Sequence, residues 1–150
     1  GVGQFDGPCG VAAFDEGGLS CLAVADHCNH RLQLFTDSGT FVRAIGRQGS
    51  APGHFFGPWG VASTLGFLIV SETAGRRVQV LTTAGTPLQL VNISAAEFGL
   101  RAICSSSDGT TYVADYLTGE VHRLSLRERQ LQSSSTSKLT GQRGNQGSHQ

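Results

Sequence analysis

The chain has 150 residues, which is the length of one domain or of part of one. It contains no run of about 18 apolar residues, so a transmembrane helix is excluded. Its 11 basic and 11 acidic residues balance, so no overall charge favours nucleic acid or an anionic membrane surface. We therefore expect no membrane partner, and any charged partner has to meet a local patch.

Glycine is frequent, and the chain repeats itself. Of the 150 residues 21 are glycine, about twice the usual share, and they recur among Val, Leu and Phe. The pattern Gly-x-Phe-x-Gly-Pro-x-Gly-Val-Ala occurs at residues 3–12 and again at 53–62, and a less regular third copy begins at Phe98. The three repeats lie at about residues 3–46, 53–93 and 97–126. Self-similarity of this kind is typical of repeat architectures.

Each repeat divides into four stretches of strand length, separated by Gly, Asp, Ser or Asn. In the first repeat the predicted strands are residues 10–14, 21–25, 31–35 and 40–45. Before residue 125 nothing sustains the apolar period of roughly 3.6 residues that a helix shows. Four antiparallel strands in roughly 45 residues are typical of one blade of a β-propeller. The sequence therefore predicts an all-β fold, an incomplete β-propeller of about three four-stranded antiparallel blades over residues 1–129.

Two glycines, Gly10 and Gly60, begin the predicted inner strands of the first two blades. Inner strands crowd together near the axis of a propeller, and glycine has no side chain to accommodate there. We therefore expect both glycines to have a packing role.

The end of the chain has a different composition. From about Gln130 onward it is rich in Ser, Gln, Gly and Thr and nearly lacks apolar residues. Such a segment buries too little apolar surface to offset the entropy lost on folding. We predict a disordered tail over residues 130–150.

The four cysteines, Cys9, Cys21, Cys28 and Cys104, form neither a Cys-x-x-Cys pair nor a zinc-finger spacing. Cysteine commonly behaves as a small core residue, so we expect buried free thiols.

One segment carries a more specific signal. Residues 26–31 read Asp-His-Cys-Asn-His-Arg, and the first two repeats open with Phe-x-x-Pro-x-Gly-Val-Ala. On these motifs the chain resembles the NHL-repeat family over about residues 3–124. The resemblance implies an NHL-type propeller of five or six blades that serves as a recognition platform, often in ubiquitin ligases of the tripartite-motif or malin type. The departures from the motif are Glu72, Gly75 and Arg76 in the second repeat and Leu100, Ala102 and Glu120 in the third.

The chain is too short for a closed ring. Six blades of about 43 residues each need about 260 residues. We therefore expect a fragment of a larger propeller, or a partial propeller that pairs with another chain. The remaining blades of a parent chain or a second copy would close the ring, because an isolated arc exposes two open flanks.

An acid and the residue five positions later flank a turn in each repeat. Asp26 with Arg31, and Glu72 with Arg77, are expected to meet across the hairpin and bind the turn backbone, which is a structural role. In the third repeat, the Glu at position 120 removes the partner of Asp115.

The segment from Asp26 to His30 also places an acid, two imidazoles and a thiol within five residues, a combination that can bind zinc. The other two repeats offer no matching ligands, so we expect no metal. The sequence has no Gly-x-Ser-x-Gly, His-Glu-x-x-His or phosphate-loop motif, so we expect no cofactor and no catalytic constellation. A metal-dependent propeller enzyme of the lyase type is the lesser alternative.

Strand alternation places two sets of loops on one face, which we call the turn face. These are the lead-in loops that precede the inner strands and the turns between the second and third strands. The turn face is predicted to carry Cys9, Trp59 and Arg101 from the lead-in loops and His27, Asn29, His30, Thr73, Arg76, Tyr116 and Thr118 from the turns. The position of Trp59 accepts Cys and Arg in the other repeats, which favours exposure over core packing.

We expect the turn face to bind protein partners and the chain to be a non-catalytic recognition module. The resemblance implies the substrate-binding part of a ubiquitin ligase whose RING domain lies outside this chain, and we expect a cytoplasmic location. RNA is the alternative partner, because four arginines stand against one acid between residues 38 and 96. The arginines are Arg43, Arg47, Arg76 and Arg77, and the acid is Glu72. The balanced charge of the whole chain favours protein over RNA.

Overall fold

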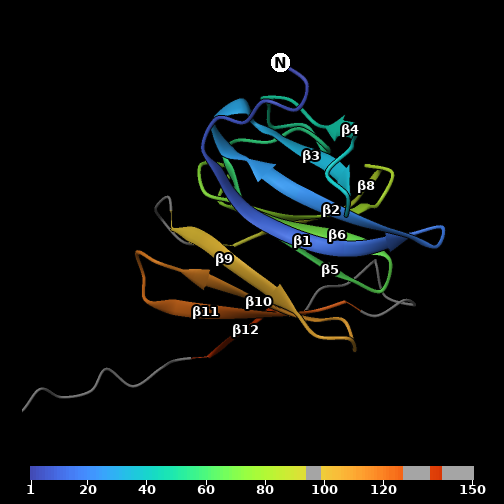
Figure 1. Ribbon diagram of the computed structural model, residues 1–150. Helices are drawn as coiled ribbons and strands as arrows, with labels where there is room; N and C mark the ends of the chain where they lie inside the picture. Colours follow the sequence, from blue (N-terminus) through green and yellow to red (C-terminus); the bar gives the residue numbers. More distant parts are fainter. Residues whose placement is uncertain (94–98, 127–135, 140–150) are drawn as a thin grey trace, which may run out of the picture.

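The computed structural model describes residues 1–93, 99–126 and 136–139 (Figure 1). Within them the chain forms β1 (Pro8–Glu16), β2 (Leu19–Asp26), the 3-10 helix η1 (His27–Asn29), β3 (Arg31–Thr36), β4 (Phe41–Ile45), β5 (Pro58–Thr64), β6 (Phe67–Glu72), β7 (Arg77–Thr82), β8 (Pro87–Asn92), β9 (Leu100–Ser105), β10 (Thr110–Asp115), β11 (Glu120–Ser125) and β12 (Thr136–Leu139). No helix in these residues is long and apolar enough to cross a membrane.

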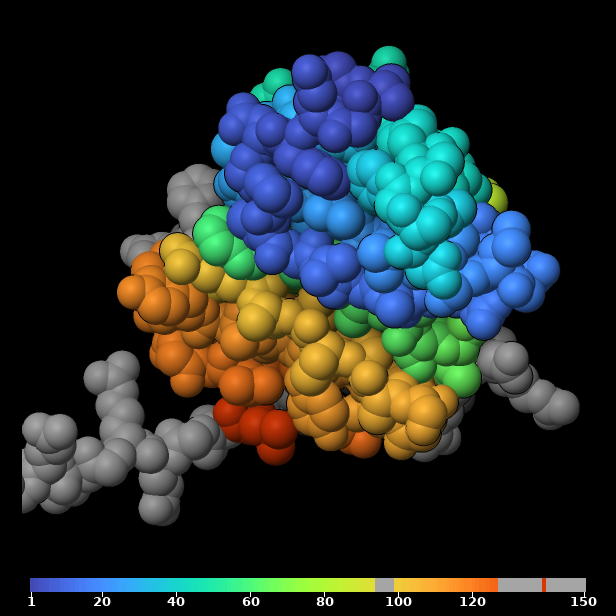
Figure 2. All heavy atoms as spheres, viewed as in Figure 1, coloured from blue at the N-terminus to red at the C-terminus, as the bar shows by residue number. Residues whose placement is uncertain are grey.

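The strands form three four-stranded sheets, and within each sheet consecutive strands pair antiparallel. We call β1–β4 blade 1, β5–β8 blade 2 and β9–β12 blade 3. The inner strand β5 contacts both β1 and β9. Figure 2 shows the blue atoms of blade 1 and the orange atoms of blade 3 on either side of the green atoms of blade 2. The all-β class and the four-stranded antiparallel blades predicted from the sequence are confirmed.

The first two strands run longer than predicted because their hairpin turn is tight. Gly17 and Gly18 have φ angles of 60° and 84°, which glycine adopts without strain. They form a two-residue connection, so the pairing of β1 with β2 continues to Glu16 opposite Leu19.

Blade 3 ends further along the chain than predicted. Residues Thr136–Leu139, inside the predicted disordered tail, form β12, which pairs antiparallel with β11. Backbone pairing does not depend on an apolar side chain, and the free edge of β11 offers a row of backbone groups to pair with. The predicted boundary at 129 is therefore too early for this strand. The predicted tail residues 130–135 and 140–150 lie outside the described residues.

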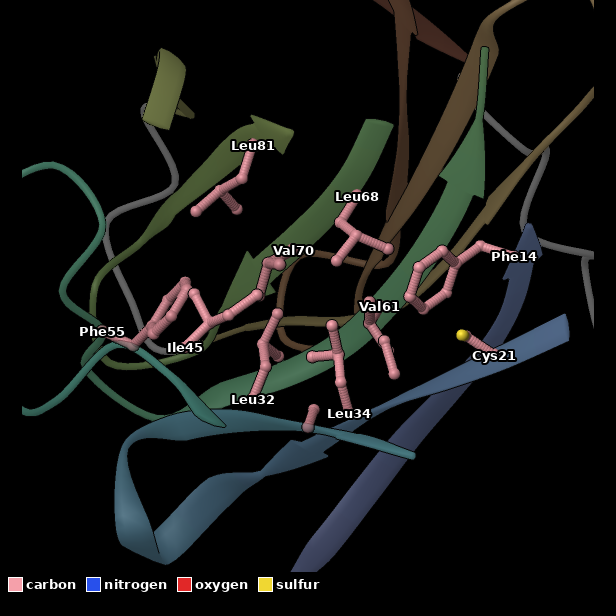
Figure 3. Packing of buried hydrophobic residues seen from close by; sticks show 12 residues of the cluster. Phe14, Cys21, Leu32, Leu34, Ile45, Phe55, Val61, Leu68, Val70 and Leu81 are labelled. Atoms are coloured by element: carbon pink, nitrogen blue, oxygen red, sulfur yellow. The ribbon is translucent and has the colours of Figure 1, made fainter. Parts of the chain in front are cut away.

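Apolar side chains alternate along the strands and fill the spaces between the blades. Figure 3 shows Leu32 and Leu34 of blade 1 pointing toward Leu68 and Val70 of blade 2, and all four are buried. A second buried cluster lies between blades 2 and 3; it consists of Ile69, Val78, Val80, Val91, Ile93, Leu100, Val113, Leu124 and Leu126.

Gly10 and Gly60 lie where the inner strands of neighbouring blades approach each other. A Cβ atom on Gly10 would be 2.7 Å from the carbonyl oxygen of Trp59, and one on Gly60 would be 2.5 Å from that of Arg101. Both distances are shorter than a Cβ atom tolerates, so only glycine fits. Each glycine therefore permits the close contact with the blade that follows it in the chain.

Candidate functional site

In blade 1 a buried acid organises the lead-in loop. Asp26 Oδ2 accepts hydrogen bonds from Arg31 Nε at 2.9 Å and from Gln33 Nε2 at 3.0 Å. Its Oδ1 accepts one from the backbone N–H of Asp6 at 2.8 Å. Arg31 and Gln33 also donate to the carbonyl oxygen of Gln4, at 2.9 and 2.8 Å. The cluster fixes the lead-in loop against its own blade.

Blade 2 repeats this arrangement with a longer acid. Glu72 Oε1 accepts hydrogen bonds from Arg77 Nε at 2.7 Å and Gln79 Nε2 at 2.6 Å, and Oε2 accepts one from the N–H of Phe56 at 2.8 Å. Arg77 and Gln79 both donate to the carbonyl oxygen of His54. Both side chains of the Glu72–Arg77 ion pair are buried.

These contacts give the two acid–Arg pairs a structural role, and they correct the prediction in one respect. Each cluster binds the backbone of the lead-in loop rather than that of the turn between the second and third strands. The sequence reasoning missed Gln33 and Gln79, which complete the clusters. The sequence does carry a signal for these two residues, because each Gln follows the Arg of its own repeat by two positions.

The first cluster also determines the ionisation of its acid. Burial raises the pKa of Asp26, but hydrogen bonds from Asp6, Arg31, Asn29 and Gln33 outweigh burial and hold the pKa below its ordinary value. The carboxylate is therefore held ionised by its contacts with the fold.

Blade 3 lacks the Arg and the Gln and has Glu120 and His122 in their places. The Oδ1 atom of Asp115 accepts hydrogen bonds from the N–H groups of Leu117 at 3.1 Å and Thr118 at 3.2 Å. The Nε2 atom of the buried His122 lies 4.0 Å from Asp115 Oδ2. Asp115 thus lacks an Arg partner, as expected. It still accepts hydrogen bonds, because the N–H groups of its own turn take the place of the Arg.

Four of the predicted turn-face residues form one array. The rings of His27 and Trp59 meet edge-on with their centroids 5.0 Å apart. The guanidinium carbon of Arg101 lies 4.7 Å from the ring centroid of Trp59 and 4.3 Å from that of Tyr116. The four side chains come from all three blades, so the array joins the blades on this face. We call it the cation–aromatic array.

The array is accessible from solvent. Tyr116 is 67% exposed. Trp59 is half-buried, so its exposure lies between the exposed position that the sequence predicts and the buried position of a core residue. Arg101 forms no ion pair with any residue that the structure describes. A groove of about 210 Å³ adjoins the array, with Cys9, Trp59 and Ala102 in its lining.

Other predicted turn-face residues hold neighbouring segments together. His30 Nδ1 accepts a hydrogen bond from the N–H of Gly57 at 3.0 Å, and Thr73 Oγ1 donates to the carbonyl oxygen of Leu100 at 2.7 Å. The turn of one blade therefore binds the segment leading into the next. Asn29 Nδ2 donates to Asp26 at 2.9 Å. The side chains of His30 and Asn29 thus have structural partners that the sequence reasoning did not foresee.

Arg76 occupies an exposed position of the blade 2 turn. Its φ angle of 52° matches that of His30, which is 53°. Gly119, at the same turn position of blade 3, has a φ angle of 71°. The shared left-handed backbone shows that the three turns are built alike, although their side chains differ.

The prediction of buried thiols is wrong for three of the four cysteines. Cys21 is buried, whereas Cys9, Cys28 and Cys104 are exposed. Cys9 lies near the start of β1, Cys28 in η1 and Cys104 near the end of β9. Partial burial of the thiol and, to a smaller extent, the neighbouring Cys28 raise the pKa of Cys9, against a smaller opposing effect of Arg101.

Several arginines that suggested RNA binding are engaged within the protein. Arg77 is paired with Glu72, and Arg43 binds Glu16 at 2.7 Å. Arg47 Nε donates to the His54 ring at 3.2 Å. Within the described ranges, no three His, Cys, Asp or Glu side chains form a group that could hold a metal ion.

The sequence matches no protein-family model and no curated protein, but solved structures match the fold. Virginiamycin B lyase from Staphylococcus aureus matches at 17% identity with a TM-score of 0.66, over 92% of this chain and 42% of that chain. A protein from Lactobacillus plantarum matches at 17% identity with a TM-score of 0.67, over 95% and 45%. A chain of a nidogen/laminin complex matches at 17% identity with a TM-score of 0.64, over 87% and 48%. The fold is that of a partial β-propeller.

The chain spans less than half the length of these solved chains. Similarity at this level of identity describes the fold alone. The three complete blades are therefore an arc of a propeller, and any function has to be argued from the side chains of this chain.

Proposed function

We propose that this chain is a non-catalytic recognition module that binds a protein partner at its turn face. The observation that carries the proposal is the cation–aromatic array of His27, Trp59, Arg101 and Tyr116. Trp, Tyr and Arg are the residue types enriched at the energetic centres of protein interfaces. A guanidinium stacked on aromatic rings is already oriented, so it loses little further freedom on binding.

The charges near the array favour a partner that presents carboxylates. Arg101 forms no ion pair with a described residue, so its charge is available to a ligand. The acids that precede the three turns, Asp26, Glu72 and Asp115, are 0%, 0% and 2% exposed. They present no negative charge at the surface of the turn face. An acidic side chain of a partner can form a charge-assisted hydrogen bond with the Arg101 guanidinium.

A binding role is favoured over catalysis because the carboxylates of the first two turns serve the fold. Asp26 and Glu72 accept hydrogen bonds from lead-in backbone and from their Arg and Gln partners. Asp26, whose hydrogen bonds hold its pKa below the ordinary value, is poorly suited to donate or accept a proton in a reaction. The solved structures of similar fold include a lyase and a nidogen/laminin complex, so fold similarity alone favours neither role.

We further propose that the propeller is of the NHL type. This proposal is supported by the segment from Asp26 to Arg31, whose first and last residues together hold the lead-in loop. The extension to the substrate-binding part of a cytoplasmic ubiquitin ligase, with its RING domain outside this chain, rests on the NHL resemblance alone.

RNA is the alternative partner and is less favoured. Binding to RNA draws much of its strength from several cations that contact phosphates. Arg43 and Arg77 are in ion pairs with acids of this chain, which reduces the local positive charge.

The test compares capture of cell proteins by the immobilised chain and by two variants. Tyr116→Ala removes an exposed member of the array, and Leu117→Ala removes its exposed neighbour outside the array. We expect a protein that binds the unaltered chain and Leu117→Ala but not Tyr116→Ala. Equal capture by all three chains would contradict the proposal. Retention of RNA instead of protein, with a steep loss of binding in high salt, would favour the alternative.

A further inference from the structure

Both imidazoles of the blade 1 turn bear on one glycine of blade 2. The N–H of Gly57 donates a hydrogen bond to Nδ1 of His30 at 3.0 Å. A Cβ atom on Gly57 would lie 2.8 Å from Cε1 of His27, so the ring of His27 packs directly against the glycine backbone. Gly57 has a φ angle of 61°, which glycine adopts without strain. The turn of blade 1 therefore holds the lead-in loop of blade 2 at this residue.

The hydrogen bond to His30 requires a neutral ring. Nδ1 accepts the hydrogen of the Gly57 N–H, so the ring carries its own hydrogen on Nε2. A protonated imidazole carries a hydrogen on each nitrogen and can only donate. Its Nδ1–H would point at the N–H of Gly57, so the bond is lost on protonation. His30 is half-buried, so a proton can reach the ring from solvent.

We propose that protonation of His30 in mildly acidic solution releases the lead-in loop of blade 2 from the turn of blade 1 and so changes the geometry of the cation–aromatic array. Histidine is the side chain that ordinarily changes its charge between about pH 5 and pH 8. Pro58 joins Gly57 to Trp59, and its ring fixes its own backbone angle φ. A displacement of Gly57 is therefore passed on to Trp59.

His27 contributes packing to this junction. Its Nδ1 atom is buried and has no hydrogen-bond partner among the residues that the structure describes. Its ring lies against Gly57 on one side and meets the ring of Trp59 edge-on, with the centroids 5.0 Å apart. Release of Gly57 removes a surface against which this ring packs, so we expect the contact between His27 and Trp59 to loosen as well.

The junction between blades 2 and 3 has no histidine at the two matching positions. Thr73 and Arg76 take the places of His27 and His30. Thr73 Oγ1 donates a hydrogen bond to the carbonyl oxygen of Leu100 at 2.7 Å, and a hydroxyl group keeps its hydrogen in mild acid. We therefore expect this loss at the junction of blades 1 and 2 and not at the corresponding turn of blade 2.

The charged and titratable groups around His30 come from both blades. They are Asp6, Asp26, His27, Cys28 and Arg31 in blade 1 and His54 and Glu72 in blade 2. The two buried carboxylates among them, Asp26 and Glu72, are paired with the arginine of their own blade at 2.9 and 2.7 Å. Each is thus already occupied by a cation. From blade 2, the ring of Phe56 meets the ring of His30 edge-on, which gives an imidazolium no anionic partner.

The variant His30→Asn keeps the acceptor and removes the titration. The side-chain oxygen of Asn can take the place of Nδ1, and Asn tolerates the left-handed backbone at this position, where φ is 53°. NMR spectra of the full chain between about pH 7.5 and pH 5.5 follow the amide proton of Gly57, in a range where the carboxylate of Asp26 stays ionised. We expect this resonance to move upfield in the unaltered chain as the bond is lost, and to stay in place in His30→Asn.

The fluorescence of Trp59, the single tryptophan, follows the array over the same pH range. Its emission should shift toward longer wavelength in the unaltered chain, because water reaches the loosened ring, and should not shift in His30→Asn. His27→Asn and His54→Gln each remove another histidine of the junction, and both should keep the shift. Circular dichroism of each variant shows whether it remains folded.

Three results would overturn the proposal: a Gly57 amide resonance that does not move in the unaltered chain, equal movement in the unaltered chain and in His30→Asn, or a fluorescence shift that disappears in His27→Asn and persists in His30→Asn. The first of them needs no variant. Both readouts work without a partner, so their failure would leave the proposed binding of a protein at the turn face standing.

Discussion

The guanidinium of Arg101 lies 4.3 Å from the ring centroid of Tyr116, and the pairing of β9 with β10 explains why. Leu100 pairs with Asp115, and the N–H of Tyr116 donates to the carbonyl oxygen of Gly99, so Arg101 and Tyr116 are diagonal neighbours across the strand pair. The turn face therefore has a cation held in place by blade 3 and presented to the ring of Trp59 in blade 2.

Loss of the buried Arg is expected to destabilise the fold. Arg77→Ala leaves the buried Glu72 without its ion-pair partner and removes one of the two hydrogen bonds to the carbonyl oxygen of His54. We expect the free energy of unfolding to fall by about 3 to 5 kcal/mol, measured by denaturant titration. Arg31→Ala is the matched variant of blade 1. Because the Arg31 side chain is 19% exposed, against 9% for Arg77, the loss should be smaller, and equal losses would contradict this explanation.

The close approach of the inner strands is tested by Gly60→Val. The new side chain would meet the carbonyl oxygen of Arg101 and the side chain of Ile103. We expect the free energy of unfolding to decrease by about 1 to 3 kcal/mol, seen as a lower melting midpoint. Ala44→Val, at an exposed position of the outer strand β4, is the control and should change the midpoint little. An unchanged midpoint for Gly60→Val would show that the inner strands are further apart than described.

Stability should depend on pH through Asp26. The pKa of Asp26 is lowered in the folded state and is about 3.9 in the unfolded chain. As the pH falls, Asp26 is therefore protonated in the unfolded chain before it is protonated in the folded chain. The contribution of ionised Asp26 is therefore complete above about pH 5 and declines as the pH falls through 4 and below. Asp108, with a pKa lowered to about 2 by hydrogen bonds from Ser106 and Thr110, acts in the same direction.

Thermal melts of the chain and of Asp26→Asn from pH 7 to pH 3 measure this dependence. Asp26→Asn should be less stable at pH 7 and should lose less stability on acidification, whereas Asp37→Asn in an exposed turn should follow the unaltered chain. If the melting midpoints of the chain and of Asp26→Asn fall equally as the pH is lowered, Asp26 is not a source of the pH dependence.

Trp59 is the single tryptophan of the chain, so its fluorescence reports on the array directly. Arg101→Ala removes the cation that covers the indole ring, and we expect the emission to shift toward longer wavelength as water reaches the ring. Arg47→Ala, an exposed arginine outside the array, should leave the emission unchanged. Identical spectra for Arg101→Ala and the unaltered chain would mean that Arg101 does not cover Trp59.

The repeat pattern made the blades predictable, because the spacing of Gly, Pro and the turn acids fixes where strands begin and end. It also placed His27, Trp59, Arg101 and Tyr116 on one face. Their mutual contacts were not predictable, because they join residues of different blades whose distances depend on how the sheets pack. The strand β12 was missed for a different reason: its pairing uses backbone groups, and the composition of the tail carries no signal for it.

The most direct test of the central claim is the affinity of a purified partner, identified by capture, for the chain and two variants in a calorimetric titration. Tyr116→Ala should weaken binding by on the order of 2 kcal/mol, about thirtyfold, while its melting midpoint stays the same, because the side chain is mostly exposed. Leu117→Ala should bind as the unaltered chain does. If Tyr116→Ala binds as tightly as Leu117→Ala, the array is not the recognition site.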